Sequence, residues 1–463
     1  MQCPPRGRAL SERTLSHHAR RVAVPTYDRA HLSPGVVHIG VGGFHRAHQA
    51  VYLDDLAAGG VSMDWGIVGV GLRSTRARDA LVPQDCLYTV VQPGANREEV
   101  RVIGALRGCL AATDSREAVL RLLASQRTRL VTLTVTAAGY HVGPRGELAC
   151  EDPEVADDLR RPGAPTTLPG YLVEALARRR RAGVAPFTLM SCDNVPGNGA
   201  VARACVMGLA EARDGRLARW IGEQVAFPHS MIDRITPRTT IAARRSLVAR
   251  HGVADRWPVT TEAFSQWIVE DAFCGSRPPL ESVGVQFVAD VEPFELVKKR
   301  LLNGTHCAIA YLGLMAGLET PAQAMSDPSL GPFTARLMDE EVVPLLPRTT
   351  GLDVAAYART VRRRLANPRI GDQLERLSAR GATKVPAYLL PSLAAARRAR
   401  RPFRLLALAV AGWLVAADRS AHDPLLGELA GEPEVVAAVR TLRSEGVRGA
   451  LSRSLSAPLE VAA

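Results

Sequence analysis

Short apolar runs alternate with helical patterns over the N-terminal part of this 463-residue chain, and this alternation constrains the fold more than any other feature. The runs with strand character are Val36–Val41, Trp65–Val70, Arg129–Val135 and Pro186–Ser191. Helical patterns over Ala47–Ala58 and Gly170–Ala182 lie among them. Buried parallel strands give such continuous apolar runs, and each pair needs a helical crossover. The sequence therefore predicts an α/β fold with a doubly wound parallel sheet.

A glycine-rich turn follows the first of these runs, in the sequence VVHIGVGGFHRAHQAVYLDDL. Gly40, Gly42 and Gly43, followed by Phe44, lie between a strand and a helix, where glycines let the backbone approach a pyrophosphate. The match to the G-x-G-x-x-G pattern is incomplete, because His45 occupies the third glycine position. An ordinary tight turn is the alternative, and the position after the first strand favours a dinucleotide-binding turn of Rossmann type.

The pattern changes from about Pro293 onward, where Ala, Leu and Arg follow helical spacing through Leu442. We expect an N-terminal arm over residues 1–34, a Rossmann-type NAD(P)-binding domain over 35–288, and a mostly α-helical substrate and catalytic domain over 289–463. The longest apolar run, Leu405–Ala417, is too short to span a bilayer and predicts a buried helix.

The formal net charge of +12 is compatible with nucleic acid or an anionic membrane as partner. The arginines are scattered along the chain, however, and aromatic residues make up only 5% of it, which disfavours base stacking. We expect neither partner. The eight cysteines form no C-x-x-C pair, and residues 1–30 lack the apolar core of a secretory signal, so we expect reduced thiols in the cytoplasm.

Only three of the 58 basic residues are lysines, and two of them, Lys298 and Lys299, lie in the segment PFELVKKRLLNGTHCAIAYLG. On a regular helix Glu295, Lys298, Asn303 and His306 project within an arc of about 140°. A desolvated lysine can release its proton, whereas arginine cannot, so Lys298 is a candidate general base for an alcohol. Surface lysines on an amphipathic helix are the alternative, which fits Lys299 better.

Other catalytic chemistries have less support in the sequence. No G-x-S-x-G motif is present, and no tyrosine is followed by lysine four positions later. His45 and His48 lie three residues apart without an evident third ligand, so we expect no metal. Alcohol oxidation by NAD or NADP with a lysine base combines the glycine turn and the lysine segment most economically.

Several long motifs resemble the polyol-specific long-chain, zinc-independent dehydrogenases, the mannitol 2-dehydrogenase family, which includes fructuronate and tagaturonate reductases. They are GVGGFHRAHQAVYLDDL (40–56), DWGIVGVGL (64–72), PFTLMSCDNVPGNG (186–199), FPHSMIDRITPRTT (227–240), QWIVEDAFCGSRPP (266–279), FELVKKRLLNGTHCAIAYLG (294–313) and NPRIGDQLERLSARGATKVPAYLLPSL (367–393). The resemblance covers about residues 35–395 in order. It implies a Rossmann-type domain followed by a mostly helical domain.

The resemblance also implies roles for individual residues. Lys298 matches the catalytic base, Asn194 and Asn303 the amides that hold the substrate oxygen, His306 the residue that orients substrate, and Glu295 a carboxylate on the proton path. Asp233, Arg376 and Lys384 match groups that bind the polyol. Amide donors and a base satisfy the needs of hydride removal from a carbinol without metal.

Two departures from the family pattern affect these expectations. The stretch like T-E-x-G-Y is here Thr136-Ala137-Ala138-Gly139-Tyr140, without its glutamate. After the second strand, the usual acidic residues are missing from Gly71-Leu72-Arg73-Ser74-Thr75-Arg76. Arg73 or Arg76 with Ser74 could instead hold a 2′-phosphate, so the cofactor expectation stays open between NAD and NADP.

The leading hypothesis is an NAD(P)-dependent polyol dehydrogenase that interconverts D-mannitol and D-fructose or a close polyol–ketose pair. A hexuronate (fructuronate or tagaturonate) reductase is the nearest alternative, and a non-catalytic nucleotide- or nucleic-acid-binding protein is the remote one. We expect a small-molecule substrate and a monomer or small homo-oligomer.

Overall fold

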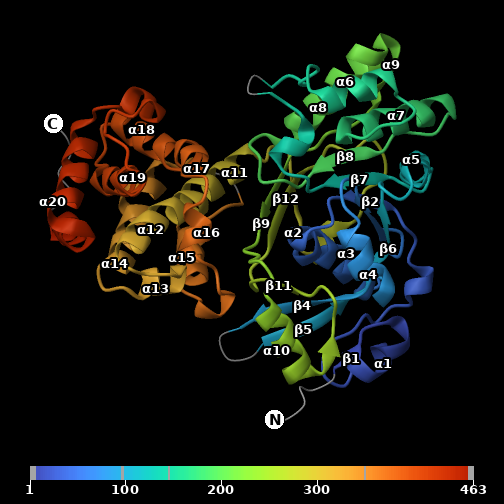
Figure 1. Cartoon of the computed structure of the whole chain (residues 1–463), viewed down its shortest axis with the longest axis horizontal. Helices are drawn as coiled ribbons and strands as arrows, with labels where there is room; N and C mark the ends of the chain where they lie inside the picture. The colour runs from blue at the N-terminus through green and yellow to red at the C-terminus, as the bar shows by residue number, and fades with distance from the viewer. Residues whose placement is uncertain (1–6, 95–97, 144–145, 349–350, 457–463) are drawn as a thin grey trace. The chain divides into compact units, whose positions relative to one another are not determined.

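A computed structural model describes residues 7–94, 98–143, 146–348 and 351–456 of the chain (Figure 1). The predicted arm (residues 1–34) and the C-terminal end of the predicted helical domain extend beyond these residues. The chain divides into two compact units, Met1–Val291 and Glu292–Ala463. Each unit is described by itself below.

The first unit is built on a five-stranded parallel sheet with the order β6-β3-β2-β7-β8. Its strands are β2 (Val36–Ile39), β3 (Ile67–Gly71), β6 (Leu106–Ala111), β7 (Leu130–Leu133) and β8 (Thr188–Ser191). In register, Val36 of β2 pairs with Ile67 of β3 on one side and with Leu130 of β7 on the other. The chain order across the sheet is thus 3-2-1-4-5, the doubly wound Rossmann order. The switch point of this order lies at β2 and β7.

Helices cover both faces of the sheet because successive strand residues point to opposite sides. Val37 of β2 and Val131 of β7 belong to one apolar core, whereas Val36 and Leu130 belong to the other. The first core packs beneath α5 (Arg116–Ala124), α7 (Leu168–Arg181), α8 (Asn198–Arg213) and α9 (Gly215–Gln224), with α6 (Pro153–Arg160) beside α7 and α8. The second packs beneath α2 (Gly43–Ala47), α3 (Gln49–Ala58) and α4 (Arg76–Leu81).

Two smaller sheets extend the first unit. One has the order β11-β4-β5 and consists of β4 (Tyr88–Pro93), β5 (Glu98–Ile103) and β11 (Val259–Thr260). The other has the order β13-β12-β9 and consists of β9 (Ser230–Asp233), β12 (Gln266–Glu270) and β13 (Gln286–Val288). The N-terminal segment contributes β1 (Arg8–Ala9), which pairs with β10 (Val253–Ala254) beside α10 (Ile241–His251). Leu10 and Leu32 of this segment are buried.

The second unit consists of helices and connecting loops, and its described residues form no strand. Its helices are α11 (Glu292–Lys298), α12 (Gly304–Met315), α13 (Pro321–Ser326), α14 (Leu330–Arg336), α15 (Val354–Leu365), α16 (Leu374–Ser378), α17 (Gly381–Tyr388), α18 (Leu390–Arg398), α19 (Arg404–Ala416) and α20 (Pro433–Ser456). The run Leu405–Ala417 forms α19, whose residues from Leu405 to Leu414 are all buried against α12 and α20, as predicted. Within the described parts, no helix is both long and apolar enough to cross a membrane.

Two local expectations need correction. The helix predicted over Ala47–Ala58 begins earlier, as α2, and breaks at His48, whose backbone leaves the helical region (φ −125°, ψ −87°) before α3 starts. The regular helix expected over Pro293–Gly313 is interrupted by a π-helical turn, η6 (Lys299–Asn303), between α11 and α12. A π turn closes a wider ring than an α turn, so the 100° spacing used for residues 295–306 does not hold across it.

Candidate active site

In the glycine turn after β2, the packing of neighbouring atoms requires a glycine at one position. At the two other glycines there is room for a side chain. Gly40 has φ +100°, and a Cβ there would lie 2.1 Å from the Thr134 carbonyl oxygen. A Cβ on Gly42 or Gly43 would meet no atom closer than 3.7 Å. Protein packing therefore does not explain Gly42 and Gly43, whereas close approach of a pyrophosphate to the backbone does. The phosphate-binding role of the turn stays a prediction. The half-buried Phe44 ring stacks on His48 with the ring centroids 5.1 Å apart.

Two buried histidines, His38 and His45, lie next to the glycine turn. The His38 Nδ1 atom lies 2.8 Å from Thr132 Oγ1 and its Nε2 atom 2.9 Å from Thr134 Oγ1. The His45 ring stacks on His38 with centroids 3.4 Å apart. Burial lowers the pKa of His38 to about 3 and that of His45 well below its ordinary value, so both rings are neutral at pH 7. His48, the other member of the rejected zinc pair, approaches the Gln266 carbonyl oxygen with its Nε2 atom at 3.0 Å.

The sequence suggested that Arg73 stands without an acidic neighbour at the end of β3. The structure shows that it has one. The Arg73 guanidinium forms an ion pair with the Glu154 carboxylate in the first turn of α6. The pair joins residues 81 positions apart. Ser74 Oγ accepts a hydrogen bond from the Arg76 amide, and the Arg76 guanidinium lies 5.4 Å from the centre of the Trp257 ring. An acidic group is therefore present at this loop, although it comes from a different segment of the chain.

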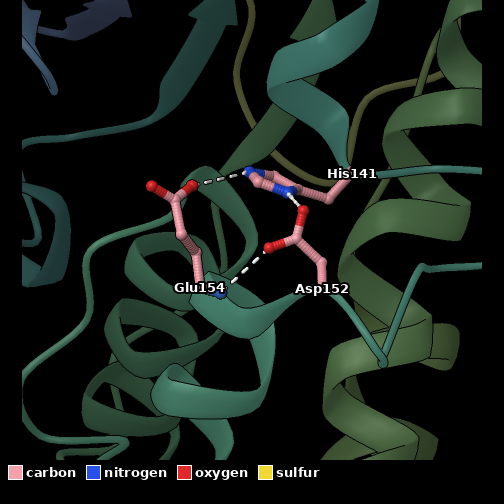
Figure 2. A group of neighbouring side chains, drawn as sticks. All are labelled: His141, Asp152 and Glu154. Atoms are coloured by element: carbon pink, nitrogen blue, oxygen red, sulfur yellow. Dashed lines mark hydrogen bonds and ion pairs between the residues drawn. The ribbon is translucent and has the colours of Figure 1, made fainter.

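Glu154 belongs to a small polar group with His141 and Asp152 (Figure 2). His141 Nδ1 lies 2.9 Å from Asp152 Oδ2, and His141 Nε2 lies 3.9 Å from Glu154 Oε2. The hydrogen bond with His141 holds the pKa of Asp152 below its ordinary value. Within the described residues this is the one set of three His, Cys, Asp or Glu side chains whose ligand atoms lie within 4.8 Å of one another. A metal ion there would have to displace Arg73 from Glu154.

The segment after β8 carries Asn194, predicted as a donor to the substrate oxygen. Asn194 is exposed, and the preceding residue, Asp193, is buried. The Asp193 carboxylate accepts hydrogen bonds from the amides of Val135 and Thr136, both at 2.9 Å, and from the Tyr140 hydroxyl at 2.7 Å. It thus fixes the stretch Thr136–Tyr140, in which Thr136 has the unusual φ of +69°. Burial raises the pKa of the Asp193 carboxyl.

Asp233, a predicted polyol-binding residue of the first unit, is the last residue of β9 and is 1% exposed. Its backbone pairs with Gln266 of β12 in antiparallel register. The structure thus places the predicted residues of this unit at the ends of strands β2, β3, β8 and β9.

In the second unit the predicted catalytic residues surround the π turn. Lys298 is the last residue of α11 and only 7% exposed, and Asn303, 9% exposed, ends the turn. His306 is half-buried in the first turn of α12. Asn303 Nδ2 is buried and has no hydrogen-bond partner among the described residues. A buried amide donor without an acceptor is costly, and a substrate oxygen would satisfy it.

The carboxylate of Glu295 forms an ion pair with Lys299, one turn away, with Oε1 and Nζ 2.9 Å apart. Both side chains are 17% exposed. Lys299 thus has a carboxylate partner on the same helical segment, in agreement with the structural role that the sequence favoured for it. The proton-path role of Glu295 remains a prediction.

Arg376 and Lys384, the other predicted polyol-binding residues, lie near one another on α16 and α17. The Arg376 Nε donates to Asp372 Oδ1 at 2.6 Å, and the Lys384 Nζ donates to the Leu377 carbonyl oxygen at 2.9 Å. Burial lowers the pKa of Lys384. Tyr311 of α12 donates to the Ser378 carbonyl oxygen at 2.8 Å, which ties α12 to the C-terminal end of α16.

A Rossmann-ordered sheet with an open glycine turn defines the first unit as a dinucleotide-binding domain. The profile of the mannitol dehydrogenase Rossmann domain matches residues 34–282, and that of the mannitol dehydrogenase C-terminal domain matches residues 290–422. The chain belongs to the mannitol dehydrogenase family. The family identification and the fold class predicted from the sequence are confirmed, and the chain is an oxidoreductase of the polyol dehydrogenase class.

Curated relatives and solved structures are similar to this chain over most of its length. The mannitol 2-dehydrogenase of Aspergillus terreus is 44% identical over 402 residues, which are 85% of this chain and 80% of that protein. The structure of Pseudomonas fluorescens mannitol 2-dehydrogenase, a ternary complex with NAD and D-mannitol, has a TM-score of 0.87 and 39% identity, and covers 97% of this chain and 100% of its own. A D-sorbitol dehydrogenase in substrate-free form has a TM-score of 0.89 and 34% identity, and covers 96% and 100%.

Sequence reasoning missed three residues that shape these surroundings. His38 lies inside a predicted strand. The pattern of apolar residues around it does not indicate that its ring stacks on His45. Asp193 lies beside the predicted Asn194, and an acidic residue two positions after a strand could have marked it. Glu154 follows Asp152-Pro153, a helix-start signature, but no spacing rule connects it to Arg73.

Proposed function

We propose that this chain is a zinc-independent dehydrogenase that interconverts D-mannitol and D-fructose with NAD as the hydride acceptor. Relatives named mannitol 2-dehydrogenase, and the Pseudomonas fluorescens enzyme described as a complex with NAD and D-mannitol, support this substrate and cofactor. One observation carries the proposal: Lys298 is buried at the start of a π turn that ends in Asn303, whose buried amide lacks an acceptor.

The proton chemistry is assigned to side chains of this chain. Lys298, as the neutral amine, takes the proton of the carbinol hydroxyl at Nζ. Asn194 and Asn303 donate hydrogen bonds to the oxygen as negative charge develops on it, and as neutral groups they do not displace the proton from the base. A bound nicotinamide ring supplies the acceptor for the hydride. His306 holds the substrate in position.

Glu295 is assigned to pass the proton from Lys298 towards water. Its ion pair with Lys299 supports this role, because the pair holds the carboxylate on the same helical segment as the base. Asp233, Arg376 and Lys384 are assigned to the remaining hydroxyls of the polyol, with Asp233 accepting and the two cations donating.

The cofactor is assigned to the first unit. Gly40, Gly42, Gly43 and Phe44 border the pyrophosphate, since the space above Gly42 and Gly43 is open. Arg73 and Ser74 border the adenosine ribose at the end of β3. With the reduced thiols expected from the sequence, we place the enzyme in the cytoplasm as a monomer or small homo-oligomer.

The test is a substrate panel followed by nicotinamide absorbance. D-mannitol, D-sorbitol and D-arabinitol are oxidised with NAD and with NADP, and fructose, fructuronate and tagaturonate are reduced with both reduced cofactors. The highest kcat/KM is expected for D-mannitol with NAD and for fructose with NADH. A higher value for either hexuronate would assign the chain as a hexuronate reductase. Absence of turnover with every substrate, together with salt-dependent DNA binding, would favour a non-catalytic protein.

A further inference from the structure

An acidic residue is expected at the end of the second strand of a dinucleotide-binding unit, where it accepts a hydrogen bond from the adenosine ribose 2′-hydroxyl. In this chain that strand is β3, which ends at Gly71 and is followed by Arg73 and Ser74. The local sequence therefore offers a cation where NAD enzymes offer an anion. The structure changes this picture, because Glu154 lies on Arg73.

The position of the Arg73–Glu154 pair is set by the sheet. β3 and β7 flank β2 on opposite sides. Arg73 follows β3, and the segment that carries His141 and Glu154 follows β7. The pair therefore joins the chain segments that leave the carboxyl edge of the sheet on the two sides of the glycine turn. Nucleotides bind in the crevice outside this edge.

Contacts with Asp152 and His141 fix the position of Glu154. Asp152 caps α6 by accepting a hydrogen bond from the Glu154 amide at 2.9 Å through Oδ1, and it contacts His141 Nδ1 at 2.9 Å through Oδ2. The His141 side chain is 6% exposed, so a buried imidazole holds the partly exposed Asp152 carboxylate in place. Figure 2 shows one Glu154 oxygen directed at His141 and the other directed away from the ring. Glu154 is itself 49% exposed and remains accessible to a ligand.

We propose that Glu154 replaces the acidic residue missing after β3: its carboxylate accepts the hydrogen bond of the adenosine ribose 2′-hydroxyl and neutralises Arg73, so that the site selects NAD over NADP. A 2′-phosphate would place two negative charges against this carboxylate and would have to compete with it for Arg73. The inference rests on the proposed function, because it assumes that the glycine turn holds a dinucleotide.

The test measures binding as well as turnover. The full-length wild type, Glu154→Gln, Arg73→Ala and the control Glu281→Gln are compared. Glu281 is an exposed glutamate of the same unit that pairs with Arg277 at 2.8 Å, so its variant also removes one exposed ion pair. Dissociation constants are measured for NADH and NADPH by fluorescence, and for 5′-AMP and adenosine 2′,5′-bisphosphate by calorimetry. Circular dichroism melting verifies that each variant is folded.

The wild type is expected to bind NADH at least about tenfold more tightly than NADPH, as one charge-assisted hydrogen bond allows. Glu154→Gln should reduce this ratio about tenfold or more, weakening NADH and 5′-AMP while strengthening NADPH and the 2′,5′-bisphosphate. Arg73→Ala should keep the preference for NADH, and Glu281→Gln should match the wild type. The ratio of kcat/KM values for the two cofactors should follow the binding ratio.

Three results would overturn the proposal. An unchanged ratio in Glu154→Gln, with 5′-AMP still bound, removes Glu154 from cofactor selection and leaves the proposed function intact. Tighter binding of NADPH than NADH by the wild type, lost in Arg73→Ala, assigns Arg73 to a 2′-phosphate instead. Failure of every nucleotide to bind the folded wild type defeats both this inference and the proposed function.

Discussion

The buried histidines beneath the glycine turn predict that this protein loses stability between pH 7 and pH 5. His38 has an ordinary pKa near 6.5 in the unfolded chain and about 3 in the folded one, because it is fully buried among Thr132, Thr134 and the ring of His45. The folded state therefore binds fewer protons than the unfolded state throughout this range. Stability is complete above the unfolded pKa and is lost as the pH falls towards the folded pKa.

The size of this loss follows from the difference between the folded and the unfolded pKa of His38. Each tenfold change in proton affinity corresponds to about 1.4 kcal/mol, so His38 costs about 4 to 5 kcal/mol once the pH is below its folded pKa. Between pH 7 and pH 5 the unfolded histidine becomes protonated, which lowers the free energy of unfolding by about 2 kcal/mol. His45 acts in the same direction, because its pKa is also lowered by burial.

The assay is urea unfolding at pH 7, 6 and 5, followed by far-ultraviolet circular dichroism for the wild type, His38→Gln and the control His31→Gln. His38→Gln loses about 1 to 3 kcal/mol at pH 7 because the threonine hydroxyls lose their partner. Its unfolding free energy should nevertheless fall by about 2 kcal/mol less than that of the wild type between pH 7 and pH 5. The His31 side chain is 80% exposed, and its variant should reproduce the wild-type pH dependence. Parallel curves for His38→Gln and the wild type would refute the reasoning.

Two further predictions concern the glycine turn and the role of metal. Gly40→Ala should lower the free energy of unfolding by about 2 to 5 kcal/mol, since its Cβ would overlap the Thr134 carbonyl at positive φ. Gly43→Ala should fold normally but bind NADH more weakly, because its Cβ would enter the open space above the turn. Thermal melting and NADH titration distinguish the two variants, and normal folding of Gly40→Ala would contradict the packing argument. Dialysis against EDTA should leave the oxidation of D-mannitol unchanged, because the proposed base and donors are a lysine and two amides. Activity that is lost and then restored by zinc would show that an ion is needed, with His141, Asp152 and Glu154 as the candidate ligands.

Four strands of the large sheet, β2, β3, β7 and β8, could be predicted because their residues form short, mostly buried apolar runs. The fifth strand, β6, was not predicted, because Arg107 and Gly108 interrupt its apolar pattern. The predicted ends extended too far, since Thr134 and Val135 after β7 continue the apolar and β-branched pattern while their backbone already turns to meet Gly40 and Asp193. The antiparallel strands β4, β5, β9 and β12 were not predicted. Their residues alternate only in part, and pairing between distant strands is decided by tertiary contacts.

The candidate residues of the second unit could be found because lysine is rare in this chain and because Lys298, Asn303 and His306 lie in one segment. Helical periodicity did not reveal the π turn at Lys299–Asn303, because a single wider turn shifts the helical spacing only once within a segment that is apolar along most of its length. The ion-pair partner of Arg73 could not be predicted from the sequence either. Glu154 is 81 positions away, and only the folded sheet brings α6 to the loop after β3.

The central claim is that Lys298 is the base of a polyol dehydrogenase, and it is tested most directly by the oxidation of D-mannitol by NAD with the wild type and Lys298→Ala. The wild type should reduce NAD, and Lys298→Ala should lose about 10²- to 10⁴-fold in kcat. Its dissociation constant for NADH, measured by fluorescence, should stay within a few-fold of the wild-type value. Lys298→Ala activity within a few-fold of wild type, or a wild type that oxidises no polyol, would contradict the account.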